Sequence, residues 1–191
     1  MSHYLQKELY GRIQSDPEIF EFIQSSGLDG LWYWDLENPE HGWMDNRFWG
    51  ILGYDPTTKK PLVHEWKNLI HPEDLALLLE NFGKHCVDSS FPCDQIVRYQ
   101  HKDGSTVWIR CRGVALHNGA GKPVRMLGTH NDVTQLKQSE SNLLDKNEFL
   151  QLILDSSLDL IFVKDEAFKI VQANQSFIEA YPAAQRDKII G

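Results

Sequence analysis

Basic charge, cysteine and long apolar runs are all scarce in this chain of 191 residues. Its 19 lysine and arginine residues are outnumbered by 27 acidic residues, which gives a formal net charge of −8. Nucleic acids and anionic membrane surfaces bind proteins that carry a basic patch, so we expect neither as a partner. No apolar run approaches membrane-spanning length, and the first residues lack the apolar core of a signal peptide. We therefore expect a cytoplasmic protein.

The three cysteines are an odd number and form no CxxC pair, which is typical of reduced thiols in a cytoplasmic protein. His85, Cys86 and Cys93 are close in sequence, but they lack the second close pair that zinc sites use, so we expect no metal site. Redox sensing would need an exposed thiol with a lowered pKa. For Cys111, which lies on the inner side of an expected strand, an inert core thiol is the favoured interpretation.

Catalytic motifs are also missing. The sequence contains no GxSxG, no HExxH and no glycine loop that could hold a phosphate. The acidic pair Glu73 and Asp74 follows Pro72, and this pattern is typical of the start of a helix. We therefore expect no catalytic residue in this chain.

The strongest pattern that is present runs from Phe91 to Thr134 and predicts three strands joined by two tight turns. Asp103-Gly104 marks the first turn, and the glycines of 118–122 are expected to supply positive φ angles in the second. The run from Thr106 to Leu116 alternates, which predicts a strand with one apolar face. Such a meander needs a second layer to cover that face.

Two helices are expected before the first strand. In Tyr4–Gln14, apolar residues four apart form a narrow stripe, which favours equally a helix packed on its own domain and a dimer contact. Ser15-Asp16-Pro17-Glu18 predicts the start of a second helix that ends at Gly27. Its expected buried face consists of Ile19, Phe20, Phe22 and Ile23.

The next part of the chain alternates short strands with short helices. The expected elements are strands at Gly30–Leu36 and His41–Met44, a helix capped by Asp45 at Asn46–Leu52, a helical turn at Val63–Ile70 and a longer helix from Pro72. Runs of helices between runs of strands indicate an α+β domain with an antiparallel sheet.

After the meander, residues 132–154 follow a heptad pattern. Leu136, Leu143 and Leu150 are seven apart, and Asn147 occupies the other apolar-seam position of its heptad. A polar residue at that position costs stability but fixes register and oligomeric state. We favour a two-stranded coiled coil and a homodimer, and the alternative is a single helix that lies on its own domain.

An internal repeat begins near Leu150. Ser157-Leu158-Asp159 is similar to Ser26–Asp29, and 173–177 is similar to 45–48. Strands are expected at Leu160–Lys164 and Phe168–Gln172. This second segment has the elements of a strand pair and a helix but no closing meander, so we expect the chain to be a piece of a longer protein.

With these elements in order, the chain resembles a PAS sensory domain of the third PAS-fold subfamily. The resemblance rests on DNRFWGILGYDP at 45–56, WKNLIHPEDL at 66–75, RYQHKDGSTVWIRCRGVAL at 98–116 and GKPVRMLGTHNDVTQLK at 121–137. The triplet Asp132-Val133-Thr134 is similar to the ending of the family's PAC motif, which joins the last strand to a signalling helix. The resemblance covers 14–137 fully, and 148–191 as the opening half of a second PAS unit.

The resemblance implies an α+β PAS fold with a five-stranded antiparallel sheet in the order 2-1-5-4-3, short helices on one face and a C-terminal linker helix. It divides the chain into an N-terminal helix (1–14), a PAS domain (15–134), a coiled-coil helix (135–154) and the truncated start of a second PAS domain (155–191). It also implies a pocket between sheet and helices, which we expect to be lined by Trp34, Phe48, Leu52, Trp66, Leu78, Ile96, Ile109 and Cys111.

Some relatives bind haem or flavin in this pocket. The flavin photoreceptors use a cysteine in an Asn-Cys-Arg-like helix motif, and none of the three cysteines has that context. Haem-binding relatives place a histidine in the long helix near the positions of Leu78 and Leu79. His85 lies well beyond these positions, and we expect it to be a partly exposed residue at a helix end. We therefore expect that the protein requires no cofactor. The sequence does not identify a ligand.

PAS units usually precede a histidine kinase or diguanylate cyclase domain, but neither output motif occurs in this sequence. The first hypothesis is a sensory module that relays a ligand or partner signal through Asp132-Val133-Thr134 into the coiled coil. The second hypothesis is a dimerisation and spacing module with a filled core and no ligand.

Overall fold

The expected meander is present in the computed structural model, which describes residues 3–190. Its strands are β3 (Asp94–Gln100), β4 (Thr106–His117) and β5 (Pro123–Asp132). Gly104 in the first turn and Gly121 in the second have positive φ angles of 91° and 75°. Gly119 does not, so the expectation of two such glycines in the second turn was wrong, and a single left-handed residue reverses the chain there.

Two more strands, β1 (Gly30–Asp35) and β2 (Gly42–Met44), complete an antiparallel sheet in the order β2-β1-β5-β4-β3. The predicted order is confirmed. β5 is the central strand, because it pairs with β1 on one side and with β4 on the other. The odd-numbered residues of β4 from Val107 to Cys111, together with Ala115, are buried, so the predicted apolar face is the inner face.

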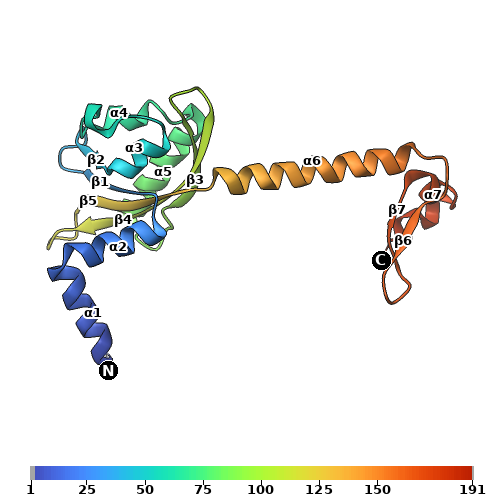
Figure 1. Cartoon of the computed structure of the whole chain (residues 1–191), viewed down its shortest axis with the longest axis horizontal. Helices are drawn as coiled ribbons and strands as arrows, with labels where there is room; N and C mark the ends of the chain where they lie inside the picture. The colour runs from blue at the N-terminus through green and yellow to red at the C-terminus, as the bar shows by residue number, and fades with distance from the viewer. Residues whose placement is uncertain (1–2, 191) are drawn as a thin grey trace. The chain divides into compact units, whose positions relative to one another are not determined.

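Short helices cover the inner face of the sheet (Figure 1). They are α3 (Asn46–Ile51), η1 (Pro56–Thr58), α4 (Val63–Lys67) and α5 (Pro72–Val87). The Asp45 side chain caps α3, since its Oδ1 accepts a hydrogen bond of 3.1 Å from the backbone N of Phe48. From α5, Leu78 and Phe82 are buried in the core that forms between these helices and the sheet.

The two N-terminal helices differ from expectation. α1 (Tyr4–Ser15) and α2 (Pro17–Gly27) have no fully buried residue, and Phe22 of α2 is 69% exposed. The expected buried face of α2 was therefore wrong, because no second layer of the described chain covers it. Within the predicted start at 15–18, Asp16 is the residue that caps α2, since its side chain accepts a hydrogen bond of 3.0 Å from the backbone N of Glu18.

The outer strand β3 is covered along part of its open edge by the segment before α5. The backbone N of His71 donates to the carbonyl oxygen of Arg98, and the backbone N of Gln100 donates to that of Leu69. Asp74 of α5 accepts hydrogen bonds from the backbone N and the guanidinium of Arg98, at 2.6 to 2.9 Å. These bonds to Arg98 hold the pKa of Asp74 below its usual value and tie α5 to the sheet.

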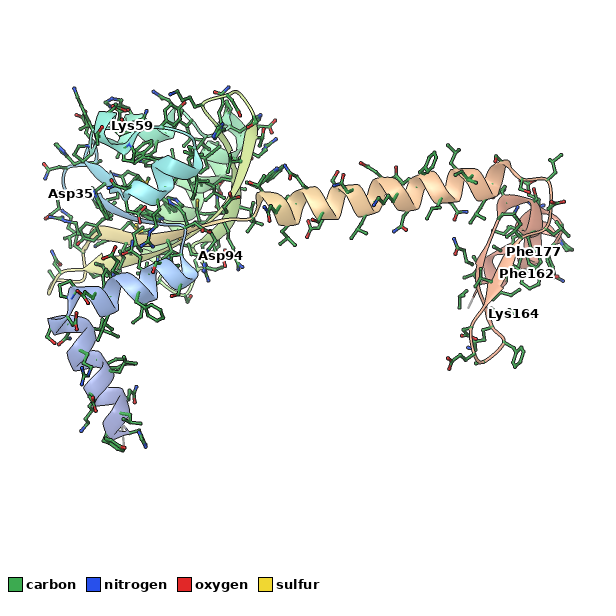
Figure 2. The ribbon with its side chains drawn as sticks, in the orientation of Figure 1. Asp35, Lys59, Asp94, Phe162, Lys164 and Phe177 are labelled. Carbon is green, nitrogen blue, oxygen red and sulfur yellow. The ribbon has the colours of Figure 1, made fainter. Side chains whose placement is uncertain are left out.

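Leu136–Gly191 form a second compact unit. Most of α6 (Thr134–Ser156) belongs to it, followed by the hairpin of β6 (Phe162–Lys164) and β7 (Ile170–Ala173), then α7 (Gln175–Glu179) and η2 (Ala183–Lys188). Phe168, expected in a strand, lies in the turn with a φ angle of 63°. Figure 2 shows Phe162 and Phe177 beside each other, and their ring centres are 4.7 Å apart.

The two units share one local geometry, which agrees with the internal repeat. Asn174 caps α7 by accepting a hydrogen bond of 3.1 Å from the backbone N of Phe177, as Asp45 does from Phe48. The backbone N of Asp45 also donates to the carbonyl oxygen of Leu31 in β1. In the same way, the backbone N of Asn174 donates to that of Ile161, the residue before β6. That the second unit is the opening half of a PAS domain stays a prediction.

The Asp74→Asn substitution should lower the free energy of unfolding by about 1 kcal/mol at pH 7, because the ionised acceptor for Arg98 is lost. The pKa of Asp74 is lowered in the folded state, so its contribution is present above the unfolded-state value of 3.8. It is lost as the pH falls through the lower folded-state value. Urea unfolding at pH 7 and near pH 3 measures both effects.

Glu73→Gln is the matched control, because the Glu73 side chain also contacts Arg98 but is 79% exposed. Its unfolding midpoint should stay close to that of the unmodified protein. An Asp74→Asn protein as stable as this control at pH 7 would show that the contact with Arg98 does not hold α5 to the sheet.

Candidate functional site

A small cavity lies between the inner face of the sheet and the helices. Its volume is about 10 Å³, which is roughly the space that one water molecule needs. Aromatic rings make up much of its wall. The lining residues are Trp32, Tyr33, Trp34, Gly42, Trp43, Met44, Trp66, Leu78, Phe82, Tyr99, Cys111 and His130.

Two glycines on neighbouring strands hold Trp32 flat against the sheet. Gly128 of β5 pairs with both Trp32 of β1 and Gly113 of β4. A Cβ atom added at Gly128 would clash with the indole of Trp32, and one at Gly113 would lie 2.8 Å from it. The indole therefore occupies space that any side chain at these two positions would fill.

Gly42 of β2 also lines the cavity, and it pairs with Trp34 of β1. A Cβ atom there would lie 3.4 Å from Nε1 of Trp66. The rings of Trp34 and Trp66 meet edge to face with centres 6.1 Å apart, and Nε1 of Trp34 donates a hydrogen bond of 2.8 Å to the carbonyl oxygen of Pro39. Trp34 is thus fixed by a partner at its polar end.

Trp32, Trp66 and His130 differ from Trp34, because each has a buried ring nitrogen without a hydrogen-bond partner in the protein. These atoms are Nε1 of the two tryptophans and Nδ1 of His130. Burial lowers the pKa of His130 to about 3, so its imidazole is neutral at physiological pH. It stacks on Phe48 with the ring centres 4.5 Å apart.

Of the eight residues that were expected to line the pocket, some line the cavity, others are buried beside it, and one is partly exposed. Trp34, Trp66, Leu78 and Cys111 line the cavity. Phe48, Leu52 and Ile109 are fully buried in the surrounding core but do not line it. Ile96 is 39% exposed and does not line the cavity, since it alternates with the buried Val97 along β3.

Sequence reasoning missed several lining residues, among them Trp32, Tyr99 and His130. Alternation along β5 could have identified His130 as an inward-facing residue. Met126, Gly128 and His130 lie at every second position, and all three are on the inner face of the sheet. That pattern places His130 in the core. It does not show which core residues border a space.

Cys93 and Cys111 are buried, and Cys86 is half-buried. Burial raises the pKa of Cys111 and of Cys86, and it raises that of Cys93 to about 11. A thiol is reactive as the thiolate, so the structure gives none of the three the character of a redox sensor. Among residues 3–190, no three metal-binding side chains of the His, Cys, Asp or Glu type group together.

The expectation that His85 is partly exposed was wrong. It is 5% exposed and not a partly exposed helix end, because the segment after α5 folds back over it. Its Nδ1 lies 2.6 Å from the carbonyl oxygen of Phe91, and its Nε2 accepts a hydrogen bond of 3.1 Å from the backbone N of Ala115. Nε2 thus joins α5 to β4, and Nδ1 contacts the loop between α5 and β3, so both ring nitrogens have partners within the protein.

The second candidate region is the junction between β5 and α6. Asp132 ends β5, and its Oδ1 accepts a hydrogen bond of 2.8 Å from the backbone N of Thr134, the first residue of α6. The Thr134 hydroxyl accepts a bond of 2.9 Å from the backbone N of Trp108 in β4, and the backbone N of Val133 donates to the Trp108 carbonyl oxygen. The start of α6 is therefore bonded directly to the sheet.

The same junction is bonded to the last residue of α2 and to the chain just after it. The backbone N of Asp132 donates a hydrogen bond of 2.9 Å to Asp29 Oδ2, and the Asn131 side chain donates to the carbonyl oxygen of Gly27. Three segments therefore meet at the last two residues of β5.

The proposed seam of α6 is exposed in the single chain. Leu136, Leu143 and Leu150 are 57%, 63% and 55% exposed, and α6 has no buried residue. Asn147, the polar seam position, is exposed as well. No helix within residues 3–190 is both long and apolar enough to cross a membrane.

Residues 43–130 match the family model described as the PAS fold. The probable diguanylate cyclase DgcE of Escherichia coli (strain K12) is 30% identical over 170 residues, which are 87% of this chain and 15% of that protein. This chain thus spans a small part of its curated relative.

Two solved structures are similar in fold. A sensory box histidine kinase/response regulator from Burkholderia thailandensis E264 is 32% identical, with a TM-score of 0.58 over 69% of this chain and 97% of that chain. An RNA-binding light-oxygen-voltage receptor is 16% identical, with a TM-score of 0.53 over 70% of this chain and 37% of that one, which shows the fold alone. The first unit of this chain therefore belongs to the PAS-fold family and is a sensor domain that resembles those of histidine kinases and diguanylate cyclases.

Proposed function

We propose that this PAS domain is a cytoplasmic input module. A ligand or a partner contact changes the sheet, and the change passes through β5 into α6. Two copies of α6 form a coiled coil that carries the signal to an output domain elsewhere in the protein. The observation that carries this proposal is the hydrogen bond between the Thr134 hydroxyl and the backbone of β4, since it joins the first turn of α6 to the sheet.

The proposed output domain is a histidine kinase or a diguanylate cyclase. Proteins of both names are similar to this chain. The first unit contains 135 of the 191 residues, so a match over 87% of the chain extends into the second unit. This supports a larger protein in which the PAS domain, α6 and the following unit occur in the same order. For the present chain we propose no catalytic activity.

The exposed leucines of α6 support the dimer. An isolated helix with a row of leucines at every seventh residue buries that row when it pairs with a second copy. Asn147 would lie in the same seam and fix the register. A coiled coil responds to small changes at one end because its two helices pack in a limited number of registers, which is what a relay requires.

A second candidate function is a dimerisation and spacing module without a ligand. The small size of the cavity favours it, because about 10 Å³ leaves room for little more than one water molecule. In this case α6 would set the distance between domains, and its geometry would not respond to the sheet.

Thr134→Val should weaken the junction while it keeps the shape of the side chain. The hydroxyl that accepts from the Trp108 backbone N is lost, so that amide should exchange its hydrogen about fivefold faster. Hydrogen exchange measured by NMR tests this change. Thr134→Ser keeps the hydroxyl and should exchange like the unmodified protein, and equal exchange in all three proteins would remove the proposed link.

Leu143→Asp should convert a dimer into a monomer, because a carboxylate cannot be buried in an apolar seam without a partner. Sedimentation equilibrium of the unmodified chain should give twice the monomer mass of 22.1 kDa, and the variant should give the monomer mass.

Leu152→Asp is the matched control for this substitution. Leu152 lies on the same helix and is 69% exposed, but its place in the heptad is away from the seam, so the dimer should persist. An unchanged dimer mass for Leu143→Asp would remove the coiled coil from the proposal.

A further inference from the structure

Three of the residues that line the cavity have an unpartnered ring nitrogen, and this indicates what the cavity could bind. Trp32, Trp66 and His130 are 4%, 4% and 2% exposed, and each has a ring nitrogen that no protein group bonds. Buried polar groups in native proteins are almost always hydrogen-bonded, and an exception needs an explanation. Three such groups belong to residues that line one cavity, so an occupant of that cavity is the simplest common partner.

The chemistry of these nitrogens favours hydrogen-bond acceptors. An indole N–H can only donate, so Trp32 and Trp66 both require an acceptor atom. Neutral His130 can donate or accept, according to its tautomer. None of the described residues that line the cavity carries a formal charge at neutral pH, so a buried anion would lose its hydration without gaining a counter-ion.

We infer that this cavity binds a small uncharged molecule that carries an acceptor oxygen on an apolar, ring-sized body. The inference rests on the proposed sensory function and names the class of ligand for that site. The rings of Trp34, Phe82 and Tyr99 supply the aromatic surroundings for such a body.

The cavity must enlarge to hold such a molecule, and Met44 is the residue best placed to move. It lines the cavity from β2, which is an edge strand of three residues. Methionine adapts its shape readily, because its side chain is unbranched and rotates about several bonds. An ordered water molecule that bonds these nitrogens is the competing occupant.

Three probes of similar size separate these alternatives in the full chain. Acetophenone carries a neutral acceptor oxygen, ethylbenzene has none, and benzoate is an anion. Titrations followed by the indole N–H signals in ¹H–¹⁵N spectra should show that acetophenone shifts the signals of Trp32 and Trp66. Acetophenone should bind about fivefold more tightly than ethylbenzene, the ratio that one hydrogen bond gives, and benzoate should not bind detectably.

Matched variants assign this preference to the unpartnered nitrogens. Trp66→Phe keeps an aromatic ring but removes the donor, so the preference for acetophenone over ethylbenzene should fall. Trp49→Phe is the control, because Trp49 is buried in the same core but does not line the cavity, so the preference should stay. Met44→Ala opens space at the cavity and should strengthen acetophenone binding severalfold.

Several results would overturn the inference. Equal binding of acetophenone and ethylbenzene, tighter binding of benzoate, or an equal loss of the preference in Trp49→Phe and Trp66→Phe would show that these nitrogens do not select the ligand. No binding of any probe, even to Met44→Ala, would show that the cavity holds water alone. If acetophenone binds as expected but the exchange of α6 amides does not respond, the relay fails and the ligand site stands.

Discussion

The backbone of β5 has to be hydrogen-bonded on both sides and then continue as a helix, and most of the first unit follows from this requirement. Pairing with β1 and β4 satisfies the strand. The first N–H groups of a helix have no partner within the helix, and here the Asp132 side chain accepts from one of them. Thr134 then bonds back to β4. The strand cannot shift against its neighbours without disturbing the start of α6.

The inner face of β5 joins this junction to the cavity. Gly128 makes room for Trp32, and His130 lies two residues further along the same strand, with Asp132 two residues beyond it. In the proposed relay, a molecule that moves the Trp32 ring acts on β5, the strand that ends at α6. Only two positions in β5 separate His130, which lines the cavity, from Asp132 at the junction. The proposed relay therefore needs no long chain of intermediate contacts.

Local rules predicted the elements of this fold well. Alternation along β4, the Asp-Gly turn and the cap at Asp45 all depend on residues close in sequence, and the structure has each of them. The register between strands depends on distant residues, so sequence alone did not show that Gly113 and Gly128 pair beneath Trp32. An apolar stripe likewise does not show whether a layer covers it, which is why the exposure of Phe22 in α2 was missed.

Coupling between the inner face of β5 and α6 is tested most directly by hydrogen–deuterium exchange of the full chain carrying Trp32→Phe. This change leaves the ring over Gly128 smaller and alters the cavity without touching the junction. We predict that exchange changes severalfold at Val133 and in the first turn of α6, while the β6–β7 hairpin stays as it is. Altered exchange in the sheet, with no change in the first turn of α6, would contradict the coupling.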